Sequence, residues 1–176
     1  PQHAPKLLQG VTTEVLGQDG LSYAPLSKDN LDLYVRYLAG LNGAPDINLD
    51  WSSVAEFRAR FDRQVAINTA YLLPHGAFRL ETLGMKDAPL VGSDLAKAQK
   101  MIDQGMREGA VGFSTGLAYY PCVYSDTKEL IELCRPVADH GGVFAPHLRS
   151  VFRGEPFDPV EEAIEISRQS GVALHF

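Results

Sequence analysis

Residues 126–148 read DTKELIELCRPVADHGGVFAPHL, and this stretch decides the fold. Asp126 followed by Glu129 is a helix-start signature, because an N-cap side chain and an acidic residue three positions on satisfy free backbone N–H groups. Three apolar residues then share one helical stripe: Leu130, Cys134 and Val137. Two glycines end the helix, and the apolar run 143–148 has the character of a strand. The stretch therefore predicts a helix followed directly by a strand.

The same alternation extends in both directions along the chain. We expect strands within 11–16, 65–73, 110–114, 143–148 and 172–176. We expect helices from Ser27 to Gly40, from 53 to 62, from Ser93 to near Gly109, from Asp126 to Gly141 and from Asp158 to Gly171. Repeated strand–helix units are typical of an α/β fold with a parallel sheet. Two closures fit this order: a (β/α)8 barrel of the TIM type, and a doubly wound open sheet. The 176 residues are fewer than the ~250 of a full barrel.

Composition limits the function classes. The chain is 45% apolar and 22% charged, which is ordinary for a soluble globular protein and excludes collagen, coiled coil and disorder. No apolar run approaches the roughly 18 residues of a membrane span, so we expect no membrane partner. The net charge of −6 and the scattered basic residues argue against a nucleic-acid partner. Two cysteines are too few for a disulfide scaffold and suit a reducing, cytoplasmic location.

Polar residues follow three of the expected strands. Asp19 lies in GQDG at 17–20, His75 follows Pro74 after the second strand, and His147 ends the fourth. Function in either closure sits at the C-terminal ends of parallel strands, and two histidines with an aspartate are what a metal site there requires. Each residue also has a structural explanation. Asp19 suits a tight turn, His75 a loop hydrogen bond to backbone, and His147 a buried strand position.

Residues 112–116 read GFSTG, which has the G-x-S-x-G spacing of serine hydrolases. That motif needs a strand, a sharp turn and an immediate helix, whereas the next expected helix begins only near Thr127. The sequence therefore disfavours Ser114 as a nucleophile. The nucleotide-binding motifs G-x-G-x-x-G and G-x-x-x-x-G-K-[ST] do not occur in the sequence.

Four blocks in order carry a resemblance to a known family. They are QGVTTEVLGQDGLSYAP at 9–25, PHGAFR at 74–79, GAVGFSTGL at 109–117 followed by Tyr119, Pro121 and Tyr124, and DHGGVFAPHLR at 139–149. With these blocks the sequence resembles the N-acyl-D-amino-acid deacylases, or D-aminoacylases, of the metal-dependent amidohydrolase superfamily. The resemblance implies a partial (β/α)8 barrel with about five strands present. Residues 1–176 would be the central part of the catalytic barrel, with its first strand and C-terminal strands missing.

The resemblance also implies site residues. His147 matches a metal ligand, and Asp19 occupies the place where typical D-aminoacylases have a metal-bridging cysteine, a departure that leaves the metal, its count and the substrate open. Tyr119 matches a tyrosine near the substrate, with His75 and Arg149 as neighbouring candidates for substrate binding. A His-x-His pair, a further metal histidine and the catalytic aspartate are expected outside the chain, so His175 is not expected to be a ligand.

The expected reaction is hydrolysis of the amide of an N-acyl-D-amino acid to a carboxylate and a D-amino acid, with Zn²⁺ or another divalent metal. The expected partner is thus a small-molecule N-acyl amino acid. Three alternatives stay open: a non-catalytic fragment of that enzyme, a related amidohydrolase with another amide or cyclic amide substrate, and a doubly wound ligand-binding domain. A fragment would expose unpaired barrel edges, which favour oligomers.

Overall fold

The computed structural model describes residues 4–43, 46–149 and 158–176. Its strands form one parallel sheet in the order β1-β2-β3-β4-β5. They are β1 (Thr13–Leu16), β2 (Asn68–Pro74), β3 (Gly112–Gly116), β4 (Val143–His147) and β5 (Ala173–Leu174). A doubly wound sheet reverses its strand order at a switch point, whereas the strands of a barrel follow one another in sequence order. The observed order therefore favours part of a barrel over the open sheet.

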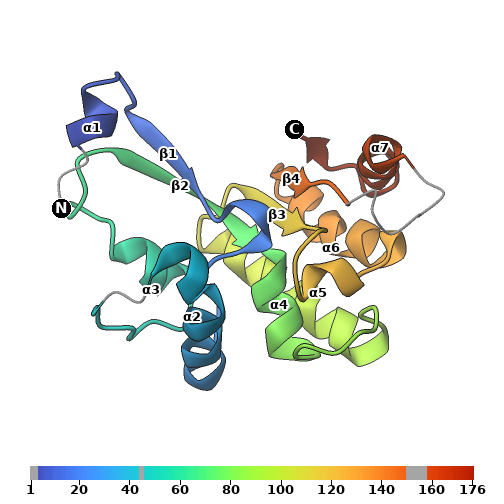
Figure 1. The fold of residues 1–176 in the computed structure, drawn as a ribbon. Helices are drawn as coiled ribbons and strands as arrows, with labels where there is room; N and C mark the ends of the chain where they lie inside the picture. Colours follow the sequence, from blue (N-terminus) through green and yellow to red (C-terminus); the bar gives the residue numbers. More distant parts are fainter. Residues whose placement is uncertain (1–3, 44–45, 150–157) are drawn as a thin grey trace.

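Seven helices occur in the described residues. They are α1 (Ala4–Leu7), α2 (Lys28–Asn42), α3 (Val54–Ala59), α4 (His75–Thr82), α5 (Gly92–Arg107), α6 (Thr127–Asp139) and α7 (Pro159–Ser170), with short 3₁₀ turns η1 (Gln18–Gly20) and η2 (Cys122–Tyr124). Figure 1 shows α4, α5 and α6 together on one side of the strands. A helix layer on one side is the arrangement of a barrel wall. None of the described helices is long and apolar enough to cross a membrane.

The caps expected at Asp126 and Asp158 are confirmed, whereas α5 begins at Gly92, one residue before the expected Ser93, with Val91 at its N-cap. The Asp126 carboxylate accepts a hydrogen bond from the Glu129 N–H at 2.8 Å, and Asp158 accepts one from the Val160 N–H at 2.8 Å. The end of α2 differs from the prediction, because the helix continues through Gly40 to Asn42. Gly40 is exposed, with open space around it, so nothing there stops the helix.

Helix α4 was not predicted from the sequence. It begins directly at the end of β2, and its first six residues, 75–80, are all buried. A helix buried on every side has no apolar stripe, so the 3.6-residue period is missing from its sequence. His75 consequently lies in the first turn of a helix and not in a loop.

Pro146 lies in β4 without disrupting the sheet. It pairs with Thr115 of β3 on one side. On the other side, β5 pairs only with Val143 and Phe144, so Pro146 has no partner in β5. The missing N–H therefore removes no bond from the β4–β5 ladder.

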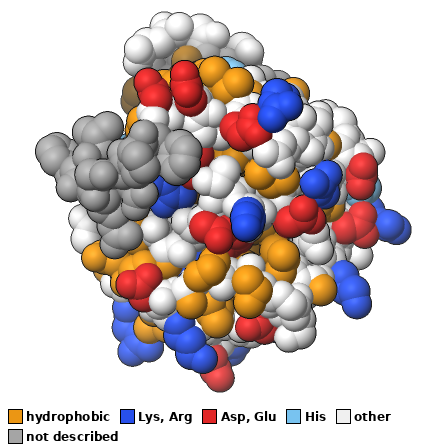
Figure 2. Space-filling view, turned by 90° about the vertical axis from the view of Figure 1, so that its right-hand side faces the viewer, with side chains coloured by type: hydrophobic (Ala, Val, Ile, Leu, Met, Phe, Trp, Pro, Cys, Tyr) orange, Lys and Arg blue, Asp and Glu red, His pale blue; other side chains and the backbone are white. Residues whose placement is uncertain are grey.

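The outer helices carry mixed charges. Figure 2 shows the side with α6 and α7, where acidic and basic side chains intermingle with hydrophobic ones. Short-range ion pairs account for several of them: Arg168–Glu165 on α7 at 2.7 Å and Arg135–Glu132 on α6 at 3.0 Å. Some of the charges on these helices therefore pair within their own helix, whereas Glu129 and Glu162 pair with residues of other elements.

Phe113 of β3 lies at the centre of the core. Its ring stacks on Phe144 of β4 at a centroid distance of 6.1 Å and lies 6.2 Å from Phe78 of α4, and it is fully buried. This one side chain connects β3, β4 and the helix layer.

We expect Phe113→Ala to lower the free energy of unfolding by about 3–5 kcal/mol, because it leaves a cavity among three elements. The measurement is a denaturant titration of the full-length protein. Leu41→Ala is the control: Leu41 is 72% exposed, and its loss should change stability by no more than about 0.5 kcal/mol. Equal effects of the two substitutions would contradict this assignment of the core.

Candidate active site

Asp19, Tyr119 and His147 meet at the C-terminal edge of the sheet. His147 Nδ1 lies 3.4 Å from Asp19 Oδ1 and 3.3 Å from the Tyr119 hydroxyl. The Tyr119 ring meets the imidazole edge-on, with centroids 4.9 Å apart. The side chains of Asp19 and His147 are 45% and 41% exposed, so a small molecule can reach both. The structure thus brings three of the five expected site residues together.

A tight turn after β1 presents Asp19. Gly17, Asp19 and Gly20 all have left-handed backbone angles, with φ of 83°, 60° and 69°. Glycine adopts these angles without strain, and aspartate tolerates them better than most residues do. The turn observed here agrees with the structural explanation of GQDG, and the same turn directs the Asp19 carboxylate toward His147. Asp19 is therefore both a turn residue and a residue of the candidate site.

Gly116, the last residue of β3, lets the site residues come close. A Cβ atom at this position would lie 2.3 Å from the Asp19 carbonyl oxygen and 2.5 Å from Cδ2 of Tyr119. Gly116 is also the register partner of His147. Only glycine fits where the turn, the tyrosine and the histidine converge on one backbone position.

The Asp19–His147 pair fits two positions of a metal shell. Carboxylate oxygen and imidazole nitrogen are both zinc ligands, and two ligands about 2.1 Å from a tetrahedral ion lie about 3.4 Å apart. Their observed separation is 3.4 Å. Within the described part of the chain, no group of three or more His, Cys, Asp or Glu side chains could hold a metal ion. A complete shell therefore needs ligands beyond those described.

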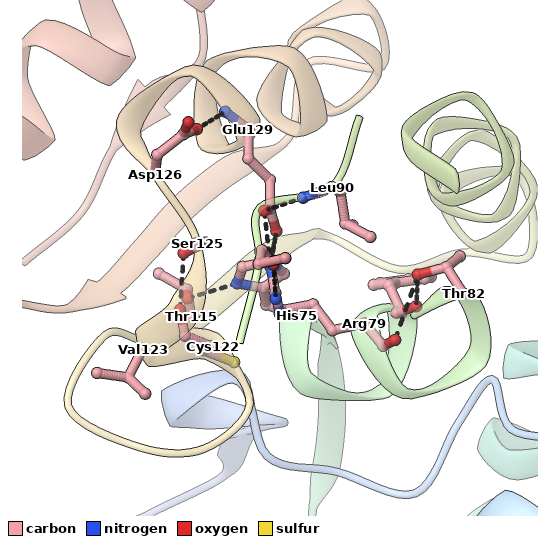
Figure 3. A network of polar contacts seen from close by, with 12 residues as sticks. His75, Arg79, Thr82, Leu90, Thr115, Cys122, Val123, Ser125, Asp126 and Glu129 are labelled. Atoms are coloured by element: carbon pink, nitrogen blue, oxygen red, sulfur yellow. Dashed lines mark hydrogen bonds and ion pairs between the residues drawn. The ribbon is translucent and has the colours of Figure 1, made fainter. Parts of the chain in front are cut away.

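His75 belongs to a buried polar network behind the site (Figure 3). Its Nδ1 lies 2.8 Å from Thr115 Oγ1 of β3, and its Nε2 lies 2.8 Å from Glu129 Oε1 of α6. Arg79 donates to Glu129 Oε2 at 2.6 Å, and the Leu90 N–H donates to the same oxygen at 2.7 Å. The side chains of His75, Arg79 and Glu129 are all fully buried. The structure therefore gives His75 protein partners on both ring nitrogens.

Charges within this network shift the pKa values of its members. Burial lowers the pKa of His75, but the neighbouring Cys122 sulfur and the Glu129 carboxylate outweigh it and raise that pKa to about 9. A protonated ring donates one N–H to Thr115 and the other to Glu129, which matches both contacts. Burial raises the pKa of Glu129, but His75 and Arg79 together bring it below its ordinary value.

Arg149 is held by an ion pair away from the Asp19–His147 pair. Its Nε and Nη2 donate to the two carboxylate oxygens of Glu162 on α7, each at 3.0 Å. Nη2 also donates to the Ser125 carbonyl at 3.1 Å. The guanidinium thus connects the end of β4 to the loop after η2 and to α7.

The chain is similar in sequence to several proteins of known function. No protein-family model matches the sequence. The chain is 31% identical to a D-aminoacylase of Alcaligenes xylosoxydans xylosoxydans, covering 97% of this chain and 34% of that protein. It is 30% identical to an N-acyl-D-aspartate deacylase of the same organism, covering 96% and 33%. The chain is a homologue of the D-aminoacylases. It spans about a third of the length of these relatives.

Solved structures extend the likeness to the fold. A crystal structure of D-aminoacylase, described as defining a novel subset of amidohydrolases, superposes with a TM-score of 0.78 at 28% identity, covering 97% of this chain and 35% of that one. N-acyl-D-glutamate deacylase from Bordetella bronchiseptica, complexed with zinc and a phosphonate inhibitor, gives a TM-score of 0.78 at 30% identity, covering 96% and 34%. The predicted partial barrel of the amidohydrolase type is thereby confirmed. Related D-aminoacylase structures also concern copper and a binuclear metal centre, so proteins similar to this chain use divalent metals.

Sequence reasoning missed most of the buried network in this D-aminoacylase homologue. The sequence marks Glu129 only as a helix-start residue, and it contains Arg79 and Thr115 only within the matched blocks. A usable signal did exist: PHGAFR puts a histidine and an arginine four residues apart in an otherwise apolar segment. Residues four apart in a helix share a face, so both could have been expected to point at one buried carboxylate.

We expect Glu129→Gln to destabilise the protein by about 3–5 kcal/mol at pH 7, because it leaves the Arg79 charge buried without its partner. A carboxylate with a lowered pKa contributes stability above its unfolded pKa of about 4.5, and this is lost as the pH falls through the folded value. The gap in thermal unfolding midpoint between wild type and variant should therefore narrow below about pH 5. Glu161→Gln, on the exposed start of α7, serves as the control, and a gap for Glu129→Gln that stays constant with pH would count against the buried ion pair.

Proposed function

We propose that the full-length protein hydrolyses the amide of an N-acyl-D-amino acid, and that residues 1–176 form the central part of its catalytic barrel. The Asp19–His147 pair carries this proposal, because a carboxylate and an imidazole, both of a type that can bind metal, lie 3.4 Å apart at the strand ends. The relatives named D-aminoacylase, N-acyl-D-aspartate deacylase and N-acyl-D-glutamate deacylase support the reaction class.

Asp19 and His147 would hold a divalent metal, for which zinc suits the oxygen and nitrogen ligands. When bound, the metal supplies a polarised amide carbonyl and an activated water. Asp19 contributes a negative charge to the shell, and His147 contributes the ring nitrogen that faces Asp19. The remaining ligands and the catalytic aspartate would come from other parts of the protein.

Tyr119 would contact the substrate. Its hydroxyl lies 3.3 Å from His147 Nδ1. A ring nitrogen that binds a metal cannot also accept a hydrogen bond from that hydroxyl. The Tyr119 O–H would then be free to donate to a substrate oxygen, where it could stabilise developing negative charge.

His75 and Arg149, expected from the sequence to bind substrate, are proposed to support the site from behind. Both ring nitrogens of His75 have protein partners, and two guanidinium nitrogens of Arg149 are paired with Glu162. His75 would fix β3 through Thr115, and Arg149 would fix the end of β4 beside His147.

The chain taken alone is proposed to be inactive. It spans about a third of its relatives, and its described residues contain no group of three metal ligands. Two ligands hold a divalent ion weakly, since structural and catalytic zinc sites use at least three protein ligands.

We expect Asp19→Asn and His147→Ala in the full-length protein to reduce bound metal and to lower kcat/KM by at least about 100-fold, because a metal contributes several kcal/mol of charge stabilisation. Asparagine is chosen because it tolerates the left-handed backbone of position 19. Metal content is measured by elemental analysis, and activity by release of free amino acid from an N-acyl-D-amino acid.

The matched controls are Asp32→Asn on α2 and His140→Ala, whose Nε2 lies 2.8 Å from Asp103 on the outer surface. Both controls should keep the metal content and the rate. Wild-type metal content and rate in both site variants would refute the proposed function.

A further inference from the structure

Ser114, the serine of the GFSTG motif, is not placed as a nucleophile would be, because its hydroxyl is bonded to the backbone of a neighbouring turn. Ser114 is fully buried in β3. Its hydroxyl donates to the Gly17 carbonyl oxygen and accepts the Gly20 N–H at 3.0 Å. Gly17 and Gly20 are the two ends of the turn that carries Asp19. One side chain therefore bonds both ends of this turn.

The turn needs such a restraint. Three of its four residues have left-handed backbone angles, and Asp19 is one of only two non-glycine residues with a positive φ in the described chain. A non-glycine residue persists in this region only when its surroundings hold it there. A free turn after a strand end would sample other conformations and point the carboxylate away from His147.

Other contacts hold the turn against β3 without fixing both ends. A Cβ atom on Gly20 would lie 3.0 Å from the Gly116 nitrogen, so the turn rests directly on the strand. The Tyr34 hydroxyl reaches the Gly20 carbonyl oxygen at 3.4 Å, a long contact. The two Ser114 bonds are shorter, and one of them satisfies the buried Gly20 N–H, which would otherwise lack a partner.

We propose that Ser114 is a positioning residue that holds the Asp19 carboxylate in place to bind the metal. This rests on the proposed role of Asp19 as a ligand. Groups that orient a metal ligand typically change metal affinity 10–100-fold when they are removed. Ser114 acts here on the backbone of the ligand residue, by closing the turn from which the carboxylate projects.

The test measures Zn²⁺ affinity of the full-length protein by competition with a chromogenic chelator. Four proteins are compared: wild type, Ser114→Ala, Asp19→Asn and the double variant. We expect Ser114→Ala to raise the Zn²⁺ dissociation constant about 10–100-fold. In the Asp19→Asn background the same substitution should change it less than about threefold, because the ligand that Ser114 positions is already lost.

Ser170→Ala is the matched control. Ser170 is also a buried serine whose hydroxyl donates to a backbone carbonyl, that of Ile166 at 2.6 Å, and it lies at the end of α7, away from the turn. This variant should bind Zn²⁺ within about twofold of wild type. Ser114→Cys, which keeps the shape and weakens the hydrogen bonds, replaces Ser114→Ala in the same cycle if the alanine variant does not fold by circular dichroism.

The outcomes separate this inference from the proposed function. Wild-type affinity in the Ser114 variant, with a loss in Asp19→Asn, overturns the inference alone. An equal loss from Ser114→Ala in both backgrounds also overturns it, since the serine would then act on general stability. Wild-type affinity in Asp19→Asn overturns the metal role of Asp19, and with it the inference.

Discussion

The Gly17–Gly20 turn lies directly on the end of β3, and the candidate site depends on that contact. Gly116 leaves room for the Asp19 carbonyl oxygen, and Ser114 bonds both ends of the turn. Because Gly116 is also the register partner of His147, the same strand end fixes both proposed ligands. The 3.4 Å separation of Asp19 and His147 is therefore set by backbone packing, although their side chains are half exposed. Rigid elements position a site more precisely than loops do. Here the turn that carries Asp19 is fixed by its contacts with the strand β3.

The buried network of His75, Arg79 and Glu129 extends this rigidity from β3 to the helix layer. Thr115, beside Ser114, bonds the His75 ring, which in turn reaches Glu129 on α6. Adjacent side chains of a strand point to opposite faces, so Ser114 and Thr115 connect β3 to the turn on one face and to the helices on the other. A buried ion pair adds little net stability compared with apolar packing. We therefore infer that this network serves mainly to hold β3 and the helices in one geometry.

Much of the fold could be predicted from the sequence, because the signals for it are local. The caps at Asp126 and Asp158 and the β-rich runs mark most helices and strands, and the matched blocks indicate a barrel. Helix α4 could not be predicted, because its first six residues are all buried and its sequence therefore has no apolar stripe. The site was predicted as a set of strand-end residues, but which of them meet depends on long-range contacts. Arg149 illustrates the limit. No local pattern shows that Glu162, 13 residues further along the chain, accepts hydrogen bonds from its Nε and Nη2.

If Asp19 is the ligand proposed above, the chain keeps the position of a site while changing the type of ligand. The resemblance puts a metal-bridging cysteine at this position, whereas the turn here demands a left-handed backbone, at φ 60°. Aspartate accepts that conformation more readily than cysteine, since its short polar side chain can bond nearby backbone. Replacing thiolate by carboxylate makes the ligand harder, which favours oxygen-loving divalent ions relative to soft ones. The backbone of Asp19 is held by contacts of Gly116 and Ser114 with the turn, and these contacts do not involve the Asp19 side chain. On the proposal that Asp19 is a ligand, the turn and the strand beneath it would fix its position, and the side chain at 19 would decide which metal it prefers.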